Sequence, residues 1–382
     1  MTEKHCSVDA LTRLSGDAQT FVDKVWARHV HVHHASASDF AGLLDLDDVD
    51  RLLTTSALRI PALRMVEDGS VLPSRRFTRS ATMGGVVLAG LVDARKVLAL
   101  FDAGASLVLQ GLHRYWPPLA ELVRGLELSL GHACQANAYL TPPGSQGFAL
   151  HSDTHDVFVV QTYGVKDWEV HDGHGVNRIR MEPGVSLYLP TGTPHSARTQ
   201  SEASLHVTIG INRTTWRTVL ERHVKQLLTD PAFDEPLPAG YHRDPESLAA
   251  DLAVHLSRLS QQLDEADVRT VAAHEVDRFA TTRGSVLRGA LVDRVSISAL
   301  HDSSWVRRRT GSVCEVRPGA DRLRVLLGDR EMRVPDWLAQ PLAAILRSDR
   351  LRPVDLAEWL DEASRLVLIR RLVREGLLEV ER

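Results

Sequence analysis

Two histidines and one aspartate are the residues of this chain best suited to hold a metal ion. His151 and Asp153 are separated by one residue at the start of an apolar run, so their side chains would point to the same face of an extended strand. His195 follows in the stretch YLPTGTPHSA (188–197). Two histidines and one carboxylate occupy one face of an octahedral metal and leave three positions open, as in non-haem Fe(II) oxygenases. We therefore predict a catalytic iron centre here rather than a structural zinc site, which a fourth protein ligand would close.

A lysine follows these residues on the next predicted strand. Lys166 comes after the Tyr163–Gly164 turn, and we expect its strand to run back antiparallel beside the strand that the candidate ligands begin. Lys166 alternates with Trp168 and Val170, which indicates that it faces the interior. A buried ammonium is costly without a counter-ion. The pattern therefore predicts a bound anion, and the distal carboxylate of 2-oxoglutarate would supply it.

Other polar side chains on neighbouring strands could complete this site. Asn137 and Tyr139 alternate on the preceding strand and could supply further hydrogen bonds. His206 lies on a later strand and could line the same pocket. His155 is the main competitor as a metal ligand, but a pairing with His151 would require a helix, which this β-rich stretch does not support.

The candidate site lies in a block of short strands. From about 135 to 213, β-branched and aromatic runs alternate with glycine and proline turns, which predicts a compact antiparallel barrel or jelly roll. Residues before this block read as mixed structure. We expect amphipathic helices at 21–28, 39–53 and 119–130, and a strand at 59–73 that is closed by an Asp-Gly turn.

Two further units are predicted after the strands end near 214. Residues 215–300 read as helices, one of which starts at the Asp244-Pro245 pair, with aspartate as the cap and proline at the first helical position. Its apolar stripe consists of Leu248, Leu252, Leu256, Leu259 and Leu263. Residues 301–382 read as a hairpin that turns at Gly328-Asp329, then helices in LRPVDLAEWL and DEASRLVLIRRLVREGLLEVER, and a final short strand, which is winged-helix-like.

Composition limits the possible classes of protein. The 382 residues are 43% hydrophobic with a formal net charge of −4, which gives no reason to expect a nucleic-acid or membrane surface. Three cysteines far apart favour a reducing compartment. The first twenty residues have no apolar core of a signal peptide, and charges interrupt the longest apolar run. We therefore expect a cytoplasmic protein that binds neither membrane nor nucleic acid.

The motifs resemble those of a known family. NAYLTPPGSQGFALHSDTHDVFVVQTYGVKDW (137–168), EPGVSLYLPTGTPHSA (182–197) and SLHVTIG (204–210) are similar to the JmjC-domain oxygenases of the cupin superfamily, and most closely to the ribosomal oxygenase branch of protein hydroxylases. The resemblance implies a double-stranded β-helix (jelly roll) over 1–214, a helical dimerisation segment over 215–300 and a winged-helix domain over 301–382.

The same resemblance implies roles for individual residues. It assigns the iron ligands to His151, Asp153 and His195, and the partner of the 2-oxoglutarate C5 carboxylate to Lys166. The two remaining positions, Asn137 and Tyr139, match pocket residues near the cosubstrate and substrate. It also implies a homodimer.

The leading functional hypothesis is an Fe(II)- and 2-oxoglutarate-dependent dioxygenase, with O2 as the second cosubstrate. It would hydroxylate a side chain of a protein, and by resemblance an arginine or histidine of a ribosomal protein. One alternative keeps this chemistry but changes the target to a peptide natural product or its precursor. A weaker alternative is a DNA-binding regulator with a cupin sensor domain. Sixteen arginines against fourteen acidic residues over 299–382 do not favour it, because DNA readers concentrate basic charge.

Acidic residues close to the candidate site in sequence suggest a basic substrate. They are Asp156, Asp167, Glu169, Asp172 and Glu182. Some of these carboxylates would lie at the surface and steer a cationic segment of a protein towards the pocket. We therefore expect an extended basic segment rather than a small free metabolite as the substrate.

Overall fold

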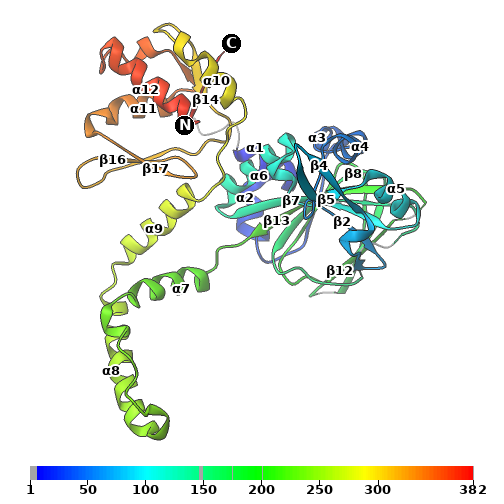
Figure 1. Cartoon of the computed structure of the whole chain (residues 1–382), viewed down its shortest axis with the longest axis horizontal. Helices are drawn as coiled ribbons and strands as arrows, with labels where there is room; N and C mark the ends of the chain where they lie inside the picture. The colour runs from blue at the N-terminus through cyan, green and yellow to red at the C-terminus, as the bar shows by residue number, and fades with distance from the viewer. Residues whose placement is uncertain (1–6, 146–148, 174, 200, 382) are drawn as a thin grey trace. The chain divides into compact units, whose positions relative to one another are not determined.

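The computed structural model describes residues 7–145, 149–173, 175–199 and 201–381. The chain separates into two compact units, 1–213 and 214–382, which are described one at a time. Figure 1 shows the elements of both units. None of the helices in these ranges has the length and apolar character that crossing a bilayer requires.

Two antiparallel sheets form the body of the first unit. The larger sheet has the strand order β1-β11-β8-β13-β7-β6-β2-β3, and the smaller one has the order β10-β9-β12. The strands of the larger sheet are β1 (His31–His34), β2 (Leu63–Glu67), β3 (Ser70–Val71), β6 (Ser106–Leu109), β7 (Ala133–Thr141), β8 (Asp156–Tyr163), β11 (Val185–Leu189) and β13 (Ser204–Asn212). Those of the smaller sheet are β9 (Lys166–Asp172), β10 (Gly175–Met181) and β12 (His195–Thr199). This is the predicted jelly roll.

One face of the larger sheet is covered by helices. The main helices are α1 (Ser7–Ser15), α4 (Leu46–Thr55), α5 (Ala94–Asp102) and α6 (Pro117–Leu130). Leucines of α1 and α6 join one apolar core with alternate residues of the central strands, such as Leu205 and Val207 of β13. Because side chains alternate along a strand, the residues between them point away from the helices and into the space between the sheets.

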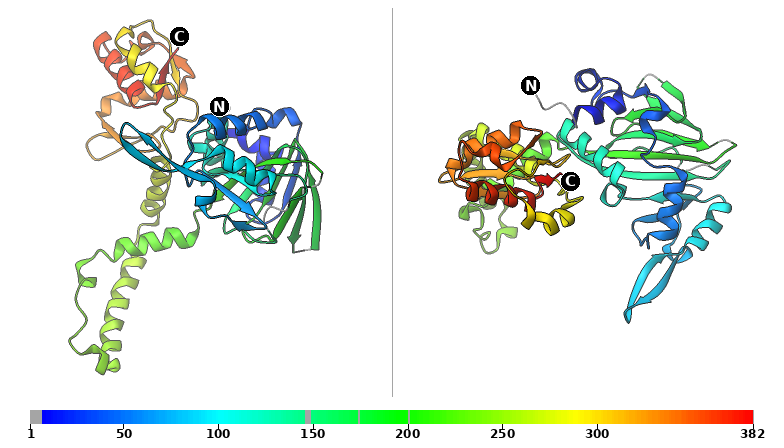
Figure 2. Two further views of the ribbon diagram at one scale, coloured as in Figure 1. Left: turned by 45° about the vertical axis from the view of Figure 1, so that its right-hand side comes forward. Right: turned by 90° about the horizontal axis from the view of Figure 1, so that it is seen from above.

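The space between the two sheets has an apolar part and a polar part. The apolar part is a core of side chains from β8, β9, β10 and β11, and includes Val159, Val170 and Leu187. The polar part lies against β13, β7, β6 and β2, which form the other half of the larger sheet. It contains the cavity described below. A separate hairpin of β4 (Thr78–Met83) and β5 (Val86–Val92) projects from this unit in Figure 2.

The predicted neighbour of the lysine strand is wrong. We expected the strand of Lys166 to pair with the preceding strand, but β9 pairs with β10 and β12, whereas β8 pairs with β11 and β13. Gly164 lies between β8 and β9 with a φ of +61°, and a Cβ here would lie 2.1 Å from the carbonyl oxygen of Ala203. Glycine therefore allows a tight turn that carries the chain from one sheet to the facing one.

Two predicted elements before the strand block differ in the structure. The helix expected at 39–53 is broken into α3 (Ala37–Phe40) and α4, because Gly42 takes a φ of +78° and Asp45 caps a new helix. The segment at 21–28 is a π-helical turn over Phe21–Val25. The strand expected at 59–73 is the short hairpin β2–β3, whose turn is Asp68-Gly69 as predicted.

Three long helices open the second unit. They are α7 (Trp216–Leu227), α8 (Pro245–Asp264) and α9 (Val268–Thr281). The Asp244 side chain accepts a hydrogen bond from the Ser247 backbone N–H at the start of α8, which confirms the predicted cap. Neither α7 nor α8 has a buried residue.

A separate apolar core lies in the rest of the second unit. Its helices are α10 (Ala290–Ser296), α11 (Ala339–Arg347) and α12 (Glu362–Arg374). Its strands are β14 (Val306–Arg308), β15 (Glu315–Arg317), β16 (Leu323–Leu326), β17 (Glu331–Val334), β18 (Arg350–Leu351) and β19 (Leu378–Val380). The predicted hairpin is β16–β17. The helix expected in LRPVDLAEWL is wrong, because this segment is β18 and a single 3-10 turn. Proline restricts the residue before it to an extended conformation, which prevents a helix from starting earlier.

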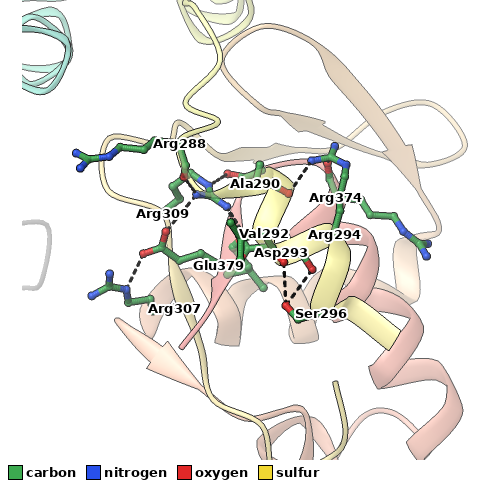
Figure 3. A network of polar contacts seen from close by, with 12 residues as sticks. Arg288, Ala290, Val292, Asp293, Arg294, Ser296, Arg307, Arg309, Arg374 and Glu379 are labelled. Atoms are coloured by element: carbon green, nitrogen blue, oxygen red, sulfur yellow. Dashed lines mark hydrogen bonds and ion pairs between the residues drawn. The ribbon is translucent and has the colours of Figure 1, made fainter. Parts of the chain in front are cut away.

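A buried arginine fixes the strands of this core to α10. Arg309 is 3% exposed, and its guanidinium donates to Asp293 Oδ2 at 2.6 Å and to Glu379 Oε2 at 3.2 Å. It also donates to the carbonyl oxygens of Arg288, Gly376 and Leu378. Figure 3 shows this network. The charge is therefore enclosed by carboxylates and carbonyls from two segments of the same unit, 288–293 and 376–379.

Candidate metal centre

A polar cavity of about 190 Å³ lies between the two sheets of the first unit. The larger sheet and the smaller sheet both contribute to its walls. The lining residues are Arg64 of β2, Ser106 of β6, Tyr139 and Thr141 of β7, His206 and Thr208 of β13, Lys166 and Trp168 of β9, His195 and Ala197 of β12, and His151 and Asp153 before β8. The cavity therefore brings together segments that are up to 144 residues apart in the sequence.

The three candidate metal ligands meet at this cavity. Their ligand atoms all lie within 4.8 Å of one another. His195 is the first residue of β12, and its backbone N–H donates to the carbonyl of His151 at 2.8 Å, while the reverse bond measures 3.1 Å. His151 and Asp153 lie in the segment before β8 rather than on the strand itself. The two-residue backbone bridge, not strand alternation, therefore holds His151 beside His195.

Backbone carbonyls determine which nitrogen each histidine offers. His151 Nδ1 lies 2.8 Å from the carbonyl oxygen of Ala149, and His195 Nδ1 lies 2.9 Å from that of Thr193. A carbonyl can only accept, so each Nδ1 carries the proton and each Nε2 keeps a lone pair. His195 Nε2 lies 3.8 Å from Asp153 Oδ2. Burial lowers the pKa of His195, which also favours the neutral ring that a metal requires.

A buried carboxylate, Asp156, supports the candidate ligands through the residues that contact them. Asp156 is fully buried and accepts from the Tyr188 hydroxyl at 2.5 Å and from the Thr191 backbone N–H at 2.8 Å. It also pairs with Arg213 at 3.2 Å. The residue after Thr191 donates its N–H to the carbonyl of Asp153 at 2.9 Å. Asp156 thus anchors the turn that contacts two candidate ligands.

This role corrects the expectation for Asp156, while the other four acidic residues are intermediate or exposed. Asp156 was expected among the carboxylates near a basic substrate, but its charge is used inside the protein. The other four, Asp167, Glu169, Asp172 and Glu182, are also absent from the described lining of the cavity. Glu169 pairs with His171 at 3.1 Å.

Lys166 reaches the cavity from the smaller sheet. Its side chain is 2% exposed, and Nζ donates to Thr141 Oγ1 at 2.9 Å across the gap between the sheets. In the described part of the chain no carboxylate forms an ion pair with it. Burial lowers the pKa of Lys166 to about 7. The alternation of Lys166, Trp168 and Val170 inwards is confirmed, because these three are buried and the residues between them are not.

The two predicted hydrogen-bonding residues of β7 lie in different places. Tyr139 lines the cavity, and burial raises the pKa of its hydroxyl. Its ring stacks on His206 with centroids 4.9 Å apart. Asn137 lies outside the described lining, and its side-chain oxygen accepts from the Gly111 backbone N–H at 3.0 Å. Burial also holds the pKa of His206 well below its ordinary value, with the charges of Lys166 and His195 adding to the effect.

Sequence reasoning missed Arg64, Ser106 and Thr141. The register of the larger sheet aligns Arg64 with Val108, Val108 with Tyr139, and Tyr139 with His206. Residues aligned in this way share one face of a sheet. Arg64 lies between the buried apolar residues Leu63 and Met65 in the sequence. Its position at the site depends on which strands pair, and this cannot be predicted from the sequence.

His155, considered as a competing ligand, lies elsewhere. It is absent from the group of described residues whose ligand atoms converge. Its imidazole lies so close to Gly210 of β13 that a Cβ at that glycine would be 2.6 Å from Nε2. His155 therefore packs against the β13 backbone.

Comparisons with known proteins show which families the chain is similar to. Residues 120–219 match the model of the JmjC domain. The chain is 28% identical over 309 residues to ribosomal oxygenase 1 of Rattus norvegicus, covering 74% of this chain and 49% of the relative. It is 35% identical over 159 residues to the bifunctional lysine-specific demethylase and histidyl-hydroxylase NO66 of Branchiostoma floridae, covering 40% and 26%. The chain thus spans less than half the length of these curated relatives.

A solved structure shares the fold over most of its length. Ribosomal oxygenase YcfD of Escherichia coli superposes with a TM-score of 0.57 at 18% identity, covering 95% of this chain and 98% of that one. The same protein has been solved in complex with cobalt and 2-oxoglutarate, with a TM-score of 0.57 at 16% identity. Fold, motif order and sequence similarity agree, and we conclude that this chain carries a JmjC domain and is a homologue of the ribosomal oxygenases.

Proposed function

We propose that the chain is an Fe(II)- and 2-oxoglutarate-dependent dioxygenase that hydroxylates a side chain of a protein. The observation that carries this proposal is the combination, in one cavity, of a three-residue ligand set and a buried lysine. Three protein ligands leave coordination positions for a chelating cosubstrate and oxygen. The lysine lies where an anion in the cavity can reach it.

The residues present fit such a metal. Both histidines are held in the tautomer that presents Nε2, and Asp153 supplies the carboxylate. His151, Asp153 and His195 would hold Fe(II), and carbonyl acceptors on Nδ1 are the usual means of orienting a histidine ligand. When bound, Fe(II) activates O2 for hydroxylation at the expense of 2-oxoglutarate.

The remaining lining residues would bind the cosubstrate. Lys166 and the Thr141 hydroxyl would hold the C5 carboxylate, because an ammonium with a hydroxyl neighbour can form charge-assisted bonds to it. Tyr139, which lines the cavity from the larger sheet, would contact the cosubstrate or the substrate. Asn137 lies outside the lining, and we propose that it supports the pocket indirectly through its bond to the Gly111 backbone. The paired sheets would exclude water.

We propose a ribosomal protein as the substrate, with an arginine or a histidine as the modified residue. The names of the relatives support it, since they include ribosomal oxygenases and a histidyl-hydroxylase. Such a substrate would be met in the cytoplasm. The same chemistry on a peptide natural product is the alternative, and a DNA-binding regulator is not favoured by the site.

The second unit is proposed to contain a dimerisation segment over 215–300 and a winged-helix domain over 301–382. The helices α7, α8 and α9 carry large apolar side chains that are exposed in the described part of the chain. The most exposed are Trp216, Leu220, Leu252, Val254, Leu256 and Val268. A second copy of the chain would bury them. Light scattering should then give twice the chain mass of 42.3 kDa, and a monomer at micromolar concentration would contradict the dimer.

The proposed activity is tested with ribosomal proteins from a strain that lacks the gene. Intact mass spectrometry should find one of them lighter by one oxygen atom, and adding the wild-type gene should restore the mass. His151→Ala, Asp153→Ala and His195→Ala should each fail to restore it. His171→Ala is the matched control, because His171 lies outside the cavity. Restoration by all three ligand variants would refute the proposal.

A further inference from the structure

Arg64 is a second cation in the candidate site and has no place in the chemistry proposed so far. It lines the same cavity as Lys166, but it comes from β2 in the larger sheet, whereas Lys166 comes from β9 in the smaller one. Burial raises the pKa of the Tyr139 hydroxyl, and the neighbouring side chains of Arg64 and Thr208 oppose this shift. Tyr139 is itself held by stacking on His206. The guanidinium therefore belongs to the wall of the cavity beside Tyr139.

The formal charges of the loaded cavity can be compared directly. Asp153 is the carboxylate among the described lining residues. A divalent metal, Asp153, the 2-oxoglutarate dianion and a protonated Lys166 together sum to zero. Arg64 adds a positive charge to this balance, because a guanidinium keeps its proton in proteins. The cavity that receives a substrate is then positive.

A positive cavity discriminates between the side chains of a protein. A guanidinium or ammonium that enters would be repelled by Arg64 in a site partly shielded from water, where charges interact more strongly than in solution. A neutral imidazole or amide would meet no such repulsion and could accept a hydrogen bond from Arg64 or Tyr139. Charge and hydrogen bonding therefore favour the same class of side chain.

We propose that Arg64 is a specificity-determining residue that excludes positively charged side chains, so that the side chain entering the cavity is uncharged. This inference rests on the proposed function and narrows it, because it favours histidine over arginine as the modified residue. Basic residues of the substrate would flank the target residue and remain outside the cavity.

Binding can be measured without identifying the natural substrate. The probes are three fluorescent peptides, Gly-Lys-Lys-Xaa-Lys-Lys-Gly, with histidine, asparagine or arginine as Xaa. Their affinities are measured by anisotropy on the full chain loaded with Fe(II) and 2-oxoglutarate under nitrogen, where no turnover occurs. At pH 8 the histidine probe is largely neutral. The wild-type protein should bind the histidine and asparagine peptides about tenfold more tightly than the arginine peptide.

The variant Arg64→Gln should remove most of this preference. The affinity for the arginine peptide should rise relative to the histidine peptide by about tenfold. Arg79→Gln is the matched control, since Arg79 is exposed on β4 and outside the cavity lining, and it should keep the wild-type preference. Titration of each variant with 2-oxoglutarate is the second measurement. Arg64→Gln could reduce the affinity for 2-oxoglutarate by a larger factor than it changes the peptide preference. That result would show that Arg64 binds the cosubstrate instead.

The outcomes separate this inference from the proposed activity. Equal affinities for the three peptides in the wild-type protein, or binding too weak to measure at millimolar peptide, would overturn the role of Arg64. A wild-type preference that Arg64→Gln leaves intact would overturn it as well. If the preference depends on Arg64 but no ribosomal protein changes mass, the proposed substrate fails while the inference stands. A hydroxylated arginine in a ribosomal protein would refute the inference and leave the activity intact.

Discussion

Two buried cations of this molecule have opposite surroundings. Lys166 in the first unit and Arg309 in the second are 2% and 3% exposed. Arg309 contacts two carboxylates and three backbone carbonyls, all supplied by its own chain (Figure 3). Lys166 donates to the hydroxyl of Thr141 and borders a cavity. Similar burial thus accompanies two carboxylates and three carbonyls around Arg309, but among the described residues only a neutral hydroxyl beside Lys166.

The difference distinguishes a structural charge from a functional one. A buried charge is costly unless its partners lie in place. Arg309 is compensated by folding alone, so its cluster stabilises the fold and needs no ligand. Lys166 has no carboxylate partner among the described residues, and burial lowers its pKa. Perturbed groups that border a cavity are typical of functional sites, so we infer that the missing partner of Lys166 is a bound anion.

The largest expected effect on stability comes from removing Arg309 from its cluster of carboxylates and carbonyls. Arg309→Met should destabilise the second unit by about 3–5 kcal/mol, because Asp293 is left as a buried charge without its main partner. Denaturant unfolding monitored on the full chain would measure the loss. The double variant Arg309→Met/Asp293→Leu should recover part of it.

The control for this prediction is an exposed ion pair at the edge of the same cluster. Arg307 is exposed and pairs with Glu379 at 2.7 Å. Arg307→Ala should change the unfolding free energy by less than about 1 kcal/mol. Equal losses in Arg307→Ala and Arg309→Met would show that burial does not decide the contribution of these arginines.

A buried anion sharpens the comparison within the first unit. Asp156 is enclosed by its own donors, so it belongs with Arg309 rather than with Lys166. Asp156→Asn should lower the free energy of unfolding by about 2–3 kcal/mol. The charge-assisted hydrogen bonds are lost, and the new side-chain NH2 group faces hydrogen-bond donors. It should also weaken metal binding, since the turn at Thr191 would lose its anchor. Tyr188→Phe, which removes one of these bonds, should cost about 1 kcal/mol.

Asp156→Asn is measured by thermal unfolding and by cobalt titration of the free protein. Stability at the wild-type level would place Asp156 outside the group of structural charges. A loss of stability with unchanged cobalt affinity would show that the turn does not position the ligands.

A further effect is expected from pH. Burial lowers the pKa of Lys166 from 10.5 to about 7, so between these values the unfolded chain binds a proton that the folded chain has released. The unfolding free energy should therefore rise with pH across this window, whereas below pH 7 the cost of the buried charge is fully present. Saturating 2-oxoglutarate, which favours the protonated lysine, should flatten the rise. The measurement is the difference in unfolding free energy between wild type and Lys166→Met at several pH values.

Much of the candidate site could be predicted from the sequence because its signals are local. The H-x-D spacing of His151 and Asp153, and the alternation around Lys166, are short patterns that survive without knowledge of the fold. The strands, the cap at Asp244 and the turn at Gly328 follow from similarly short patterns. Glycine, proline and capping residues act within a few positions, so they can be read directly.

The features that were missed depend on pairing between distant strands. Arg64 reaches the site only because β2 pairs with β6 and β6 with β7. β9 lies in the smaller sheet, opposite β8, because the chain turns at Gly164. The sequence alone does not distinguish this turn from a hairpin turn. Asp156 appeared to be a surface carboxylate because its donors at Tyr188, Thr191 and Arg213 follow it by 32 to 57 residues.

The central claim is that Lys166 is buried in order to bind an anion, and one variant tests it most directly. Lys166→Met keeps the length and apolar stem of the side chain and removes the charge. Unfolding of the ligand-free protein and calorimetric titration of the cobalt-loaded protein with 2-oxoglutarate are measured on wild type and variant together. The account predicts that the free variant is at least as stable as wild type, while its affinity for 2-oxoglutarate falls by about 1.5–3 kcal/mol. A variant that loses stability as Arg309→Met does, yet binds 2-oxoglutarate as tightly as wild type, would contradict it.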